Sequence, residues 1–119
     1  MIIQSFLTIQ SQLRVLHWQT KSYAAHQALG SAYEAMDELV DGFIETYAGA
    51  DPEILNIDSC NIKCQSIDSL SPMSFMDSVH SFLSGKLSSA IPEEHTDLHN
   101  IKDEMIAVVN KTKYLLSLE

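Results

Sequence analysis

Helix-breaking residues are scarce in this sequence, which has only four Gly and three Pro among 119 residues. The first glycine is Gly30, and no proline precedes Pro52. Because Gly and Pro interrupt helices while Leu, Ala, Met and Glu favour them, we expect long helices. The hydrophobic content of 45% is enough for a buried core. The length predicts one domain over residues 1–119.

Basic residues are also few. Seven Lys and Arg stand against sixteen Asp and Glu, which gives a formal net charge of −9 at pH 7. Sequence-independent binding to nucleic-acid phosphates needs a basic surface, so we expect no nucleic-acid partner. An acidic chain instead attracts cations.

Long apolar runs are missing, and none approaches the ~20 residues of a membrane-spanning helix. The N-terminal segment lacks an initial basic region and a small-residue cleavage site, which argues against a signal peptide. Only two cysteines occur, Cys60 and Cys64. They are too few for a disulfide scaffold, so we expect a reducing, cytoplasmic location. A loop disulfide or two inert thiols is a better expectation for this pair than a metal site with two outside ligands.

The spacing of apolar residues predicts four amphipathic helices. One stripe steps from Ile2 to Leu16 and a second from Ala25 to Tyr47. At about 100° per residue the two stripes are offset by roughly 140°, so one straight helix cannot carry both. The chain should therefore turn at Thr20–Ser22, where either hydroxyl can cap a new helix. The expected helices are 2–18, 23–48 with Gly49 as its C-terminal cap, 72–88, and a last one that opens at Pro92.

Residues 50–71 show neither the helical nor the strand period. Asp51-Pro52-Glu53 can open one short helical turn through Leu55, and the rest is expected to be a packed loop. Such a loop is either functional or the crossover that a four-helix bundle needs. The predicted fold is all-α, a four-helix bundle with a long loop between its second and third helices. The expected core stripe of the last helix is Leu98, Ile101, Met105, Val108, Thr112 and Leu115.

The helix over residues 23–48 carries a second face beside its core stripe. Glu45 follows Asp41 by one turn, so the two carboxylates can approach one point. Imidazoles with helix-spaced carboxylates suit a non-haem metal site in a helical bundle, and His17 at the turn can face the same space as His26. A solvated acidic face with a structural histidine explains the pattern as well. The second face consists of His26, Gly30, Tyr33, Asp37, Asp41 and Ile44.

These residues carry a resemblance. His17-Trp18, a short turn, His26, and then Asp41 and Glu45 resemble the ferroxidase motif of the miniature ferritins, the starvation-induced DNA-protection (Dps) group. That family forms ferritin-like four-helix bundles, and its iron centre lies at a two-fold interface, with His from one subunit and Asp and Glu from its mate. The resemblance implies Fe(II) oxidation by peroxide or dioxygen, and a homodimer or higher homo-oligomer. The metal ligands it implies, for iron or another divalent metal, are His17, His26, Asp41 and Glu45.

The resemblance covers about residues 13–49 and departs from the family's pattern. The interval between the two His is shorter, and the basic N-terminal tail that some members use on DNA is missing. Gly30 stands one turn after His26, where the family has an additional carboxylate ligand. The string HWQTKSYAAHQALGSAYE and NIKDEM near the C-terminus resemble small ferritin-like proteins of tailed phages. A phage origin would place the protein in the host cytoplasm.

Weaker candidate ligands lie nearby and on the last helix. Asp37 precedes Asp41 by one turn, and Glu104 is the expected inward carboxylate of the last helix. His95 and His99 are also one turn apart, a spacing that can bind a metal, although capping and solvation explain them too.

A second hypothesis keeps the fold and drops the metal chemistry. The second face of the 23–48 helix is then a docking surface, and the protein is a helical adaptor or inhibitor of a host protein. Gly30, in place of a ligand, favours this hypothesis. Retention of both His with Asp41 and Glu45 favours the metal site.

Overall fold

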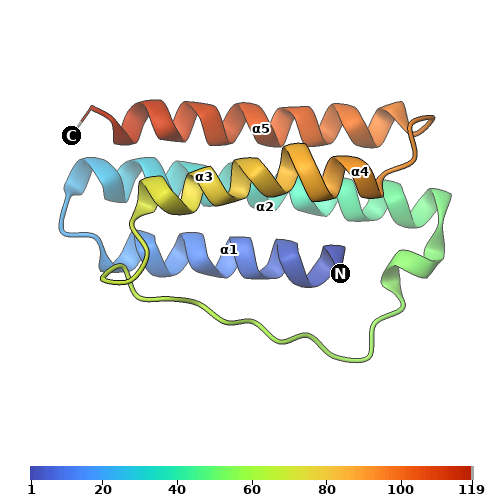
Figure 1. Ribbon diagram of the computed structural model, residues 1–119, viewed down its shortest axis with the longest axis horizontal. Helices are drawn as coiled ribbons and strands as arrows, with labels where there is room; N and C mark the ends of the chain where they lie inside the picture. Colours follow the sequence, from blue (N-terminus) through green and yellow to red (C-terminus); the bar gives the residue numbers. More distant parts are fainter. Residues whose placement is uncertain (119) are drawn as a thin grey trace.

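The structure is a computed structural model that describes residues 1–118, and the secondary structure over that range is entirely helical. The helices lie roughly along one long axis (Figure 1). In chain order they are α1 (Ile2–Gln19), α2 (Tyr23–Ala50), the 3-10 turn η1 (Pro52–Leu55), α3 (Pro72–Phe82), the π-helical segment η2 (Leu83–Leu87), α4 (Ser88–Ala90) and α5 (Thr96–Leu116).

Two helix starts lie where the sequence predicts them. Ser22 is the N-cap of α2, and its hydroxyl accepts a hydrogen bond from the Ala25 N–H at 3.1 Å. Ser71 caps α3 in the same way, accepting from the Ser74 N–H at 3.2 Å, and Pro72 follows as the first helical residue. Each hydroxyl pairs one of the N–H groups that the start of a helix leaves without a partner.

Two other boundaries were predicted wrongly. α2 continues through Gly49 to Ala50, and its C-cap is Asp51. The helix ends there because the residue before a proline is disfavoured in the α conformation, and Pro52 follows. The last helix begins at Thr96 rather than at Pro92, because the His95 N–H first closes a turn onto the Pro92 carbonyl at 3.1 Å.

α2 is the central helix of the arrangement. It packs against α1 on one side and α5 on the other, and α3 packs on α5, whereas α1 and α3 have no comparable contact. None of the helices within residues 1–118 is long and apolar enough to cross a membrane. The largest fully buried side chains are Phe6, Leu13, Leu16, Leu29, Met36, Phe43, Met76, Leu83, Leu87, Leu98, Met105 and Val109.

The buried face of α5 is rotated from its predicted position. Ile101, Val108 and Leu115 are only half-buried. Lys102 enters the core side because its ammonium group reaches the Ser88 hydroxyl and the Asp103 carboxylate, both at 3.3 Å, while its stem packs. The buried residues of α5 are Leu98, Lys102, Met105, Val109, Thr112 and Leu116.

Residues 56–71 join η1 to α3 by running along α1 (Figure 1), and we call this segment the strap. Three glutamines spaced along α1 accept hydrogen bonds from strap N–H groups, so side chains of the helix satisfy the backbone of the strap. The three N–H to Oε1 bonds are Asn61 to Gln4 at 2.9 Å, Gln65 to Gln12 at 2.7 Å and Ile67 to Gln19 at 2.7 Å.

The three bonds follow the same order along both segments, since Asn61, Gln65 and Ile67 pair in turn with Gln4, Gln12 and Gln19. The strap therefore runs in the same direction as α1.

Cys60 and Cys64 lie on the strap as free thiols. Of the expected alternatives, the structure has the two thiols and no loop disulfide.

Candidate functional site

His17 in the last turn of α1 and His26 in the first turn of α2 stack face to face across the short connection between the helices. Their ring centroids are 3.8 Å apart and their planes differ by 14°. His17 Nδ1 lies 2.7 Å from the His26 carbonyl oxygen, and His26 Nδ1 lies 2.8 Å from the His17 carbonyl oxygen. Since a carbonyl oxygen only accepts, each Nδ1 carries a proton and donates it.

This protonation leaves the lone pair of each neutral imidazole on Nε2. A histidine that ligates a metal through Nε2 commonly donates its Nδ1–H to a backbone carbonyl in the same way, which fixes the ring and its tautomer. Each ring of the His17–His26 stack is therefore chemically suited to hold a metal through its Nε2 atom, although the nearly parallel planes do not direct both lone pairs at one ion.

Gly30 supplies the space for this stack. A Cβ atom at position 30 would lie 2.9 Å from His17 Cε1 and 3.2 Å from His17 Nδ1, closer than side chains tolerate. Any residue larger than glycine must displace the His17 ring. A carboxylate side chain at position 30 is therefore incompatible with the stacked arrangement of the two imidazoles.

A row of contacts continues from the stack along the α1/α2 interface. The His17 ring meets the Tyr33 ring edge to face, with centroids 5.3 Å apart. The Arg14 guanidinium lies over the Tyr33 ring, 4.7 Å from its centroid, and forms an ion pair with Asp37. Gln10 Nε2 also donates to Asp37, at 2.9 Å. Asp37, a weaker candidate ligand, is thus hydrogen-bonded to two side chains of α1.

Asp41 and Glu45 lie farther along the same face of α2, and both are exposed. Neither has an ion pair or side-chain hydrogen bond within residues 1–118. Fifteen helical residues separate His26 from Asp41, a rise of ~22 Å, so one chain cannot place its imidazoles and these carboxylates on one ion. In agreement, no group of three or more His, Cys, Asp or Glu in the described part of the chain is arranged to hold a metal.

Apolar side chains surround the two carboxylates. A cavity of about 210 Å³ opens between α1 and α2 beside them. Its apolar lining includes Ile3, Leu7 and Ile44, and Leu7 is among the exposed large hydrophobic residues. One end of the α1/α2 face therefore carries imidazoles, and the other carries carboxylates beside an apolar hollow.

The remaining candidates lie apart from this face. Glu104 is exposed and not inward as expected, because the buried face of α5 is rotated toward Lys102. His95 is the N-cap residue of α5 and its ring lies 6.2 Å from that of Tyr47. His99 Nδ1 lies 3.4 Å from Lys102 Nζ. His99 Nε2, in contrast, is buried without a hydrogen-bond partner among the described residues.

Sequence reasoning missed two residues of the site. Arg14 and Gln10 hold Asp37, and Gln10, Arg14 and His17 follow one another on α1 at helical spacings of four and three residues. Those spacings place the three residues on one face of the helix, and this was the signal in the sequence that could have identified Arg14 and Gln10. Trp18, which follows His17 in the motif, is 69% exposed within one chain.

Comparison with known proteins gives one match. A family model described as a family of unknown function (DUF5856) matches residues 17–116. No curated protein and no solved structure matches the chain. The matched range includes both stacked histidines, the carboxylates of α2 and the strap.

Proposed function

The chain belongs to DUF5856, a family of unknown function, and from the geometry of the α1/α2 face we propose that it binds a divalent metal, with iron as the expected ion, between two copies of the chain. The observation that carries the proposal is the pair of Nδ1–H donations that leave two stacked imidazoles with Nε2 lone pairs. The second observation is that Asp41 and Glu45 are exposed one turn apart on the same face.

The arrangement requires a second copy because the two halves of the ligand set are far apart in one chain. A two-fold axis through the middle of the α1/α2 face, near Tyr33, would turn a second copy end for end. His17 and His26 would then lie opposite the partner's Asp41, and the reverse would hold at the other end. The apolar hollow beside Asp41 would be covered by the same contact, which favours association.

In this proposal the histidines are neutral ligands and the carboxylates neutralise the charge of the ion. Asp41 and Glu45 repel each other when they are brought together without a cation. A bound cation attracts both carboxylates and outweighs this repulsion. Bound Fe(II) would supply an electron to peroxide or dioxygen. Tyr33 acts as a positioning residue because its ring packs edge to face with that of His17, and Arg14 in turn lies over Tyr33 and pairs with Asp37.

We also propose a ferritin-like arrangement of the helices, with the strap as the crossover. The strap carries the chain back along the length of the bundle between α2 and α3, as the long connection of such bundles does. A cytoplasmic location, in the host cell for a phage protein, is part of the same proposal.

Metal analysis of mixed variants tests the inter-subunit site directly. One variant carries His17→Ala with His26→Ala, and the other carries Asp41→Asn with Glu45→Gln. Each alone should lose Fe(II) binding under anaerobic conditions. Unfolded together and refolded as a mixture, they should regain binding, because a mixed dimer has one site with both histidines and both carboxylates intact.

The outcomes separate the parts of the proposal. Failure of the wild type to bind Fe(II) or another divalent ion would refute metal binding altogether. Metal binding without recovery in the mixture, while light scattering still shows mixed dimers, would refute the shared site but not the metal. A mixture of wild type with the Lys111→Gln variant, an exposed residue of α5, controls for the refolding step.

Exposed aromatic residues favour the second candidate function, a helical adaptor or inhibitor that binds another protein. Trp18 and Tyr23 flank the α1/α2 turn with 69% and 76% of their surfaces exposed. Aromatic side chains of this kind are enriched at protein–protein interfaces. Wild-type protein that is monomeric by light scattering and binds no divalent metal would favour this function.

A further inference from the structure

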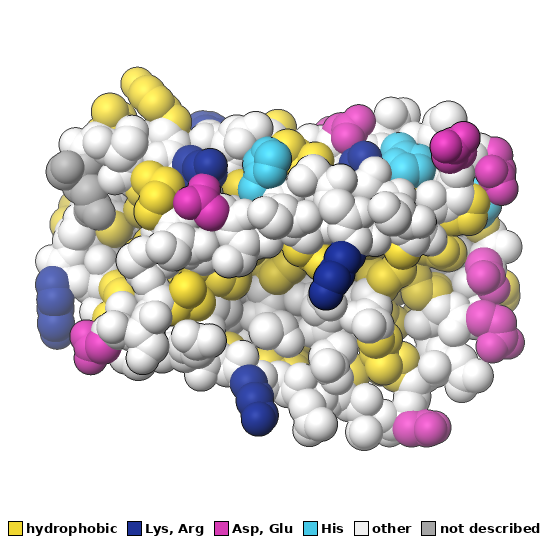
Figure 2. All heavy atoms as spheres, viewed as in Figure 1, with side chains coloured by type: hydrophobic (Ala, Val, Ile, Leu, Met, Phe, Trp, Pro, Cys, Tyr) yellow, Lys and Arg dark blue, Asp and Glu magenta, His cyan; other side chains and the backbone are white. Residues whose placement is uncertain are grey.

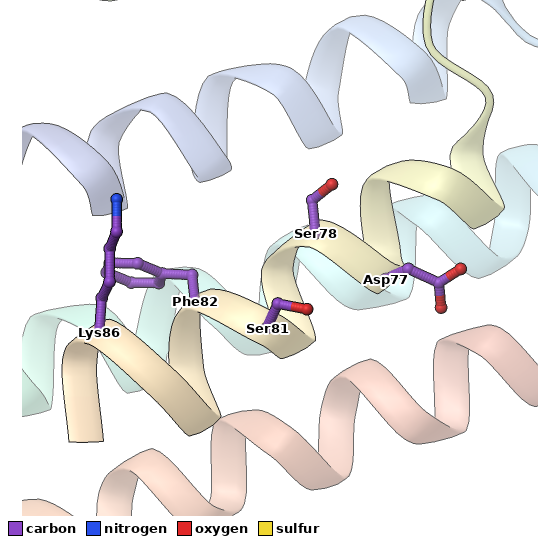
Figure 3. Close-up of a pocket in the computed structure, with 5 residues that line it drawn as sticks. All are labelled: Asp77, Ser78, Ser81, Phe82 and Lys86. Carbon is purple, nitrogen blue, oxygen red and sulfur yellow. The ribbon is translucent and has the colours of Figure 1, made fainter. Parts of the chain in front are cut away.

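The hollows on the surface differ in what they could bind. In the hollow of about 470 Å³ along α3, Ser78 and Lys86 point toward α1, whereas Asp77 pairs with Lys113 of α5 at 2.7 Å (Figure 3). These side chains do not converge on one point where a ligand could bind. The hollow between α1 and α2 has mostly apolar walls and a volume of about 210 Å³. Because small-molecule sites usually have ~300–1,000 Å³, this hollow better suits one apolar side chain of a protein.

Tyr23 is the most exposed large hydrophobic residue in the described part of the chain, with 76% of its surface exposed. It is the first residue of α2, three residues before His26, and the centroids of these two rings are 6.4 Å apart. Its hydroxyl accepts a hydrogen bond from Gln27 Nε2 at 2.7 Å. These contacts hold the ring in place outside the core. An aromatic side chain thus projects from one end of the α1/α2 face, and the apolar hollow lies at the other end.

The exposed ring and the hollow lie at matching distances from the middle of this face. Positions 23 and 44 of α2 are equally far from the point just after Tyr33, and so are positions 26 and 41. A two-fold axis that crosses α2 there at right angles places Tyr23 opposite the partner's Ile44. The same rotation places His26 opposite the partner's Asp41. Because such a contact is self-complementary, each copy offers the aromatic side chain that the other copy's hollow can receive.

α1 completes the hollow at this level. It runs antiparallel to α2, as the contacts of Gln10 with Asp37 show, so its first turns lie beside the last turns of α2. Ile3 and Leu7 therefore line the hollow together with Ile44. Leu7 is 37% exposed, so the apolar wall is accessible from outside.

The two ends of the face also differ in charge. Residues 15–27, around the α1/α2 turn, include Lys21 and no Asp or Glu. Acidic side chains gather at the opposite end of the molecule, where α2 meets η1 and α5 begins (Figure 2). On the α1/α2 face, Asp41 and Glu45 border the hollow toward that end. The rotation that brings Tyr23 to the hollow also brings Lys21 to this acidic border, so the charges favour the same alignment.

We propose that Tyr23 anchors a homodimer by inserting into the hollow of a second copy, between Ile3, Leu7 and Ile44. The proposal rests on the two-fold arrangement proposed for the shared metal site, but the contact itself needs no metal. Each dimer contains the contact twice, and aromatic side chains seated in pockets commonly dominate the energy of an interface. The metal-free protein is then already a dimer, and its histidines and carboxylates are aligned before an ion binds.

Sedimentation equilibrium of the full chain in EDTA tests the anchor in the absence of metal. The wild type should dimerise reversibly. Tyr23→Ser should raise the dissociation constant of the dimer by at least about tenfold, because both anchors are lost. Tyr114→Ser is the matched control, since Tyr114 is 63% exposed but lies on α5, and it should leave the constant unchanged. Circular dichroism checks that each variant is folded.

A pair of complementary variants tests the register. Leu7→Trp fills the hollow and should weaken its own homodimer as Tyr23→Ser does. In an equal mixture, the intact Tyr23 of the Leu7→Trp chain can enter the open hollow of the Tyr23→Ser chain, and the filled hollow faces the serine. The mixed dimer should therefore be more stable than either homodimer. If Leu7→Trp does not fold, Ile44→Trp fills the same hollow.

The outcomes separate the anchor from the metal site. A metal-free wild type that stays monomeric, a Tyr23→Ser dimer as tight as that of the wild type, or a mixture without preference for mixed dimers would overturn the anchor, even if Fe(II) still binds between two copies. A Tyr23-dependent dimer that binds no divalent metal would support the anchor and refute the metal site. A monomeric wild type that binds a tyrosine-containing helical peptide saturably would overturn the dimer and assign the hollow to another protein.

Discussion

The imidazole of His17 lies against the backbone of Gly30, so closely that a Cβ atom there would be 2.9 Å from Cε1. This contact joins the end of α1 to the second turn of α2. It also explains how two imidazoles can stack at 3.8 Å between helices that are connected by only a few residues.

Substitution of Gly30 by Ala should be neutral or destabilising, although alanine is favoured over glycine inside helices by about 1 kcal/mol. The new methyl group displaces the His17 ring and breaks its hydrogen bond to the His26 carbonyl, a loss of about 1 kcal/mol. Gly42→Ala is the matched control, since no atom lies within 4 Å of its Cβ position. It should stabilise the fold by about 0.5–1 kcal/mol in urea denaturation. Equal gains in the two variants would show that the His17 contact carries no cost.

The Arg14–Asp37 pair should show a measurable coupling energy. Both side chains are about one-third exposed, at 35% and 34%, and Arg14 also stacks on Tyr33. A double-mutant cycle with Arg14→Met and Asp37→Asn should give about 0.5–1 kcal/mol, reduced in 1 M salt. The more exposed Lys113–Asp77 pair is the comparison and should give less. Coupling that is insensitive to salt would contradict an ionic origin.

Replacement of Gln12 by Met should loosen the strap. Gln12 is 2% exposed, and its side-chain amide both accepts from the Gln65 N–H at 2.7 Å and donates to the Gln65 carbonyl at 2.9 Å. Loss of these two bonds should lower the free energy of unfolding by about 1–3 kcal/mol. Amide hydrogen exchange at Gln65 should accelerate more than elsewhere. Gln19→Met, which removes one bond to the strap from an exposed residue, should have the smaller effect.

Mild oxidation should modify the thiols separately. The N–H groups of Asn61 and Gln65 are bonded to α1, and closing a Cys60–Cys64 disulfide competes with these bonds, so oxidised glutathione should give mixed disulfides on the native protein. Exposed Cys64 should react before half-buried Cys60. The Cys60–Cys64 disulfide should form readily only in urea, and mass spectrometry after proteolysis distinguishes the products. Rapid formation of that disulfide in the native protein would show that the bonds to α1 do not restrain the strap.

Local signals in the sequence predicted the helices well, because the caps at Ser22 and Ser71 and the apolar stripes act within a few residues. The core stripe of α5 was harder. Positions 101 and 102 both fit its period, and the apolar Ile101 was preferred over Lys102. Only the three-dimensional position of Ser88, on a different helix, makes the lysine acceptable there.

The candidate site shows the same limit. The spacing of His26, Asp41 and Glu45 places them on one face of α2, as predicted from the helical period. The helical period gives the angle of a residue around the axis but not its position along it, and Asp41 lies ~22 Å along the helix from His26, with Glu45 farther still. The role of Gly30 depends on a ring that arrives from another helix, so the sequence showed only the absence of a side chain.

The hydrogen bonds between the strap and α1 have a consequence for the lengths of chain that this fold tolerates. Surface loops normally accept insertions and deletions. The strap is bonded to α1 at Asn61, Gln65 and Ile67, so adding or removing a residue between these positions moves at least one N–H group away from its glutamine. Insertions should therefore be tolerated within residues 56–60, before the first of these bonds, and should be costly between residues 61 and 67.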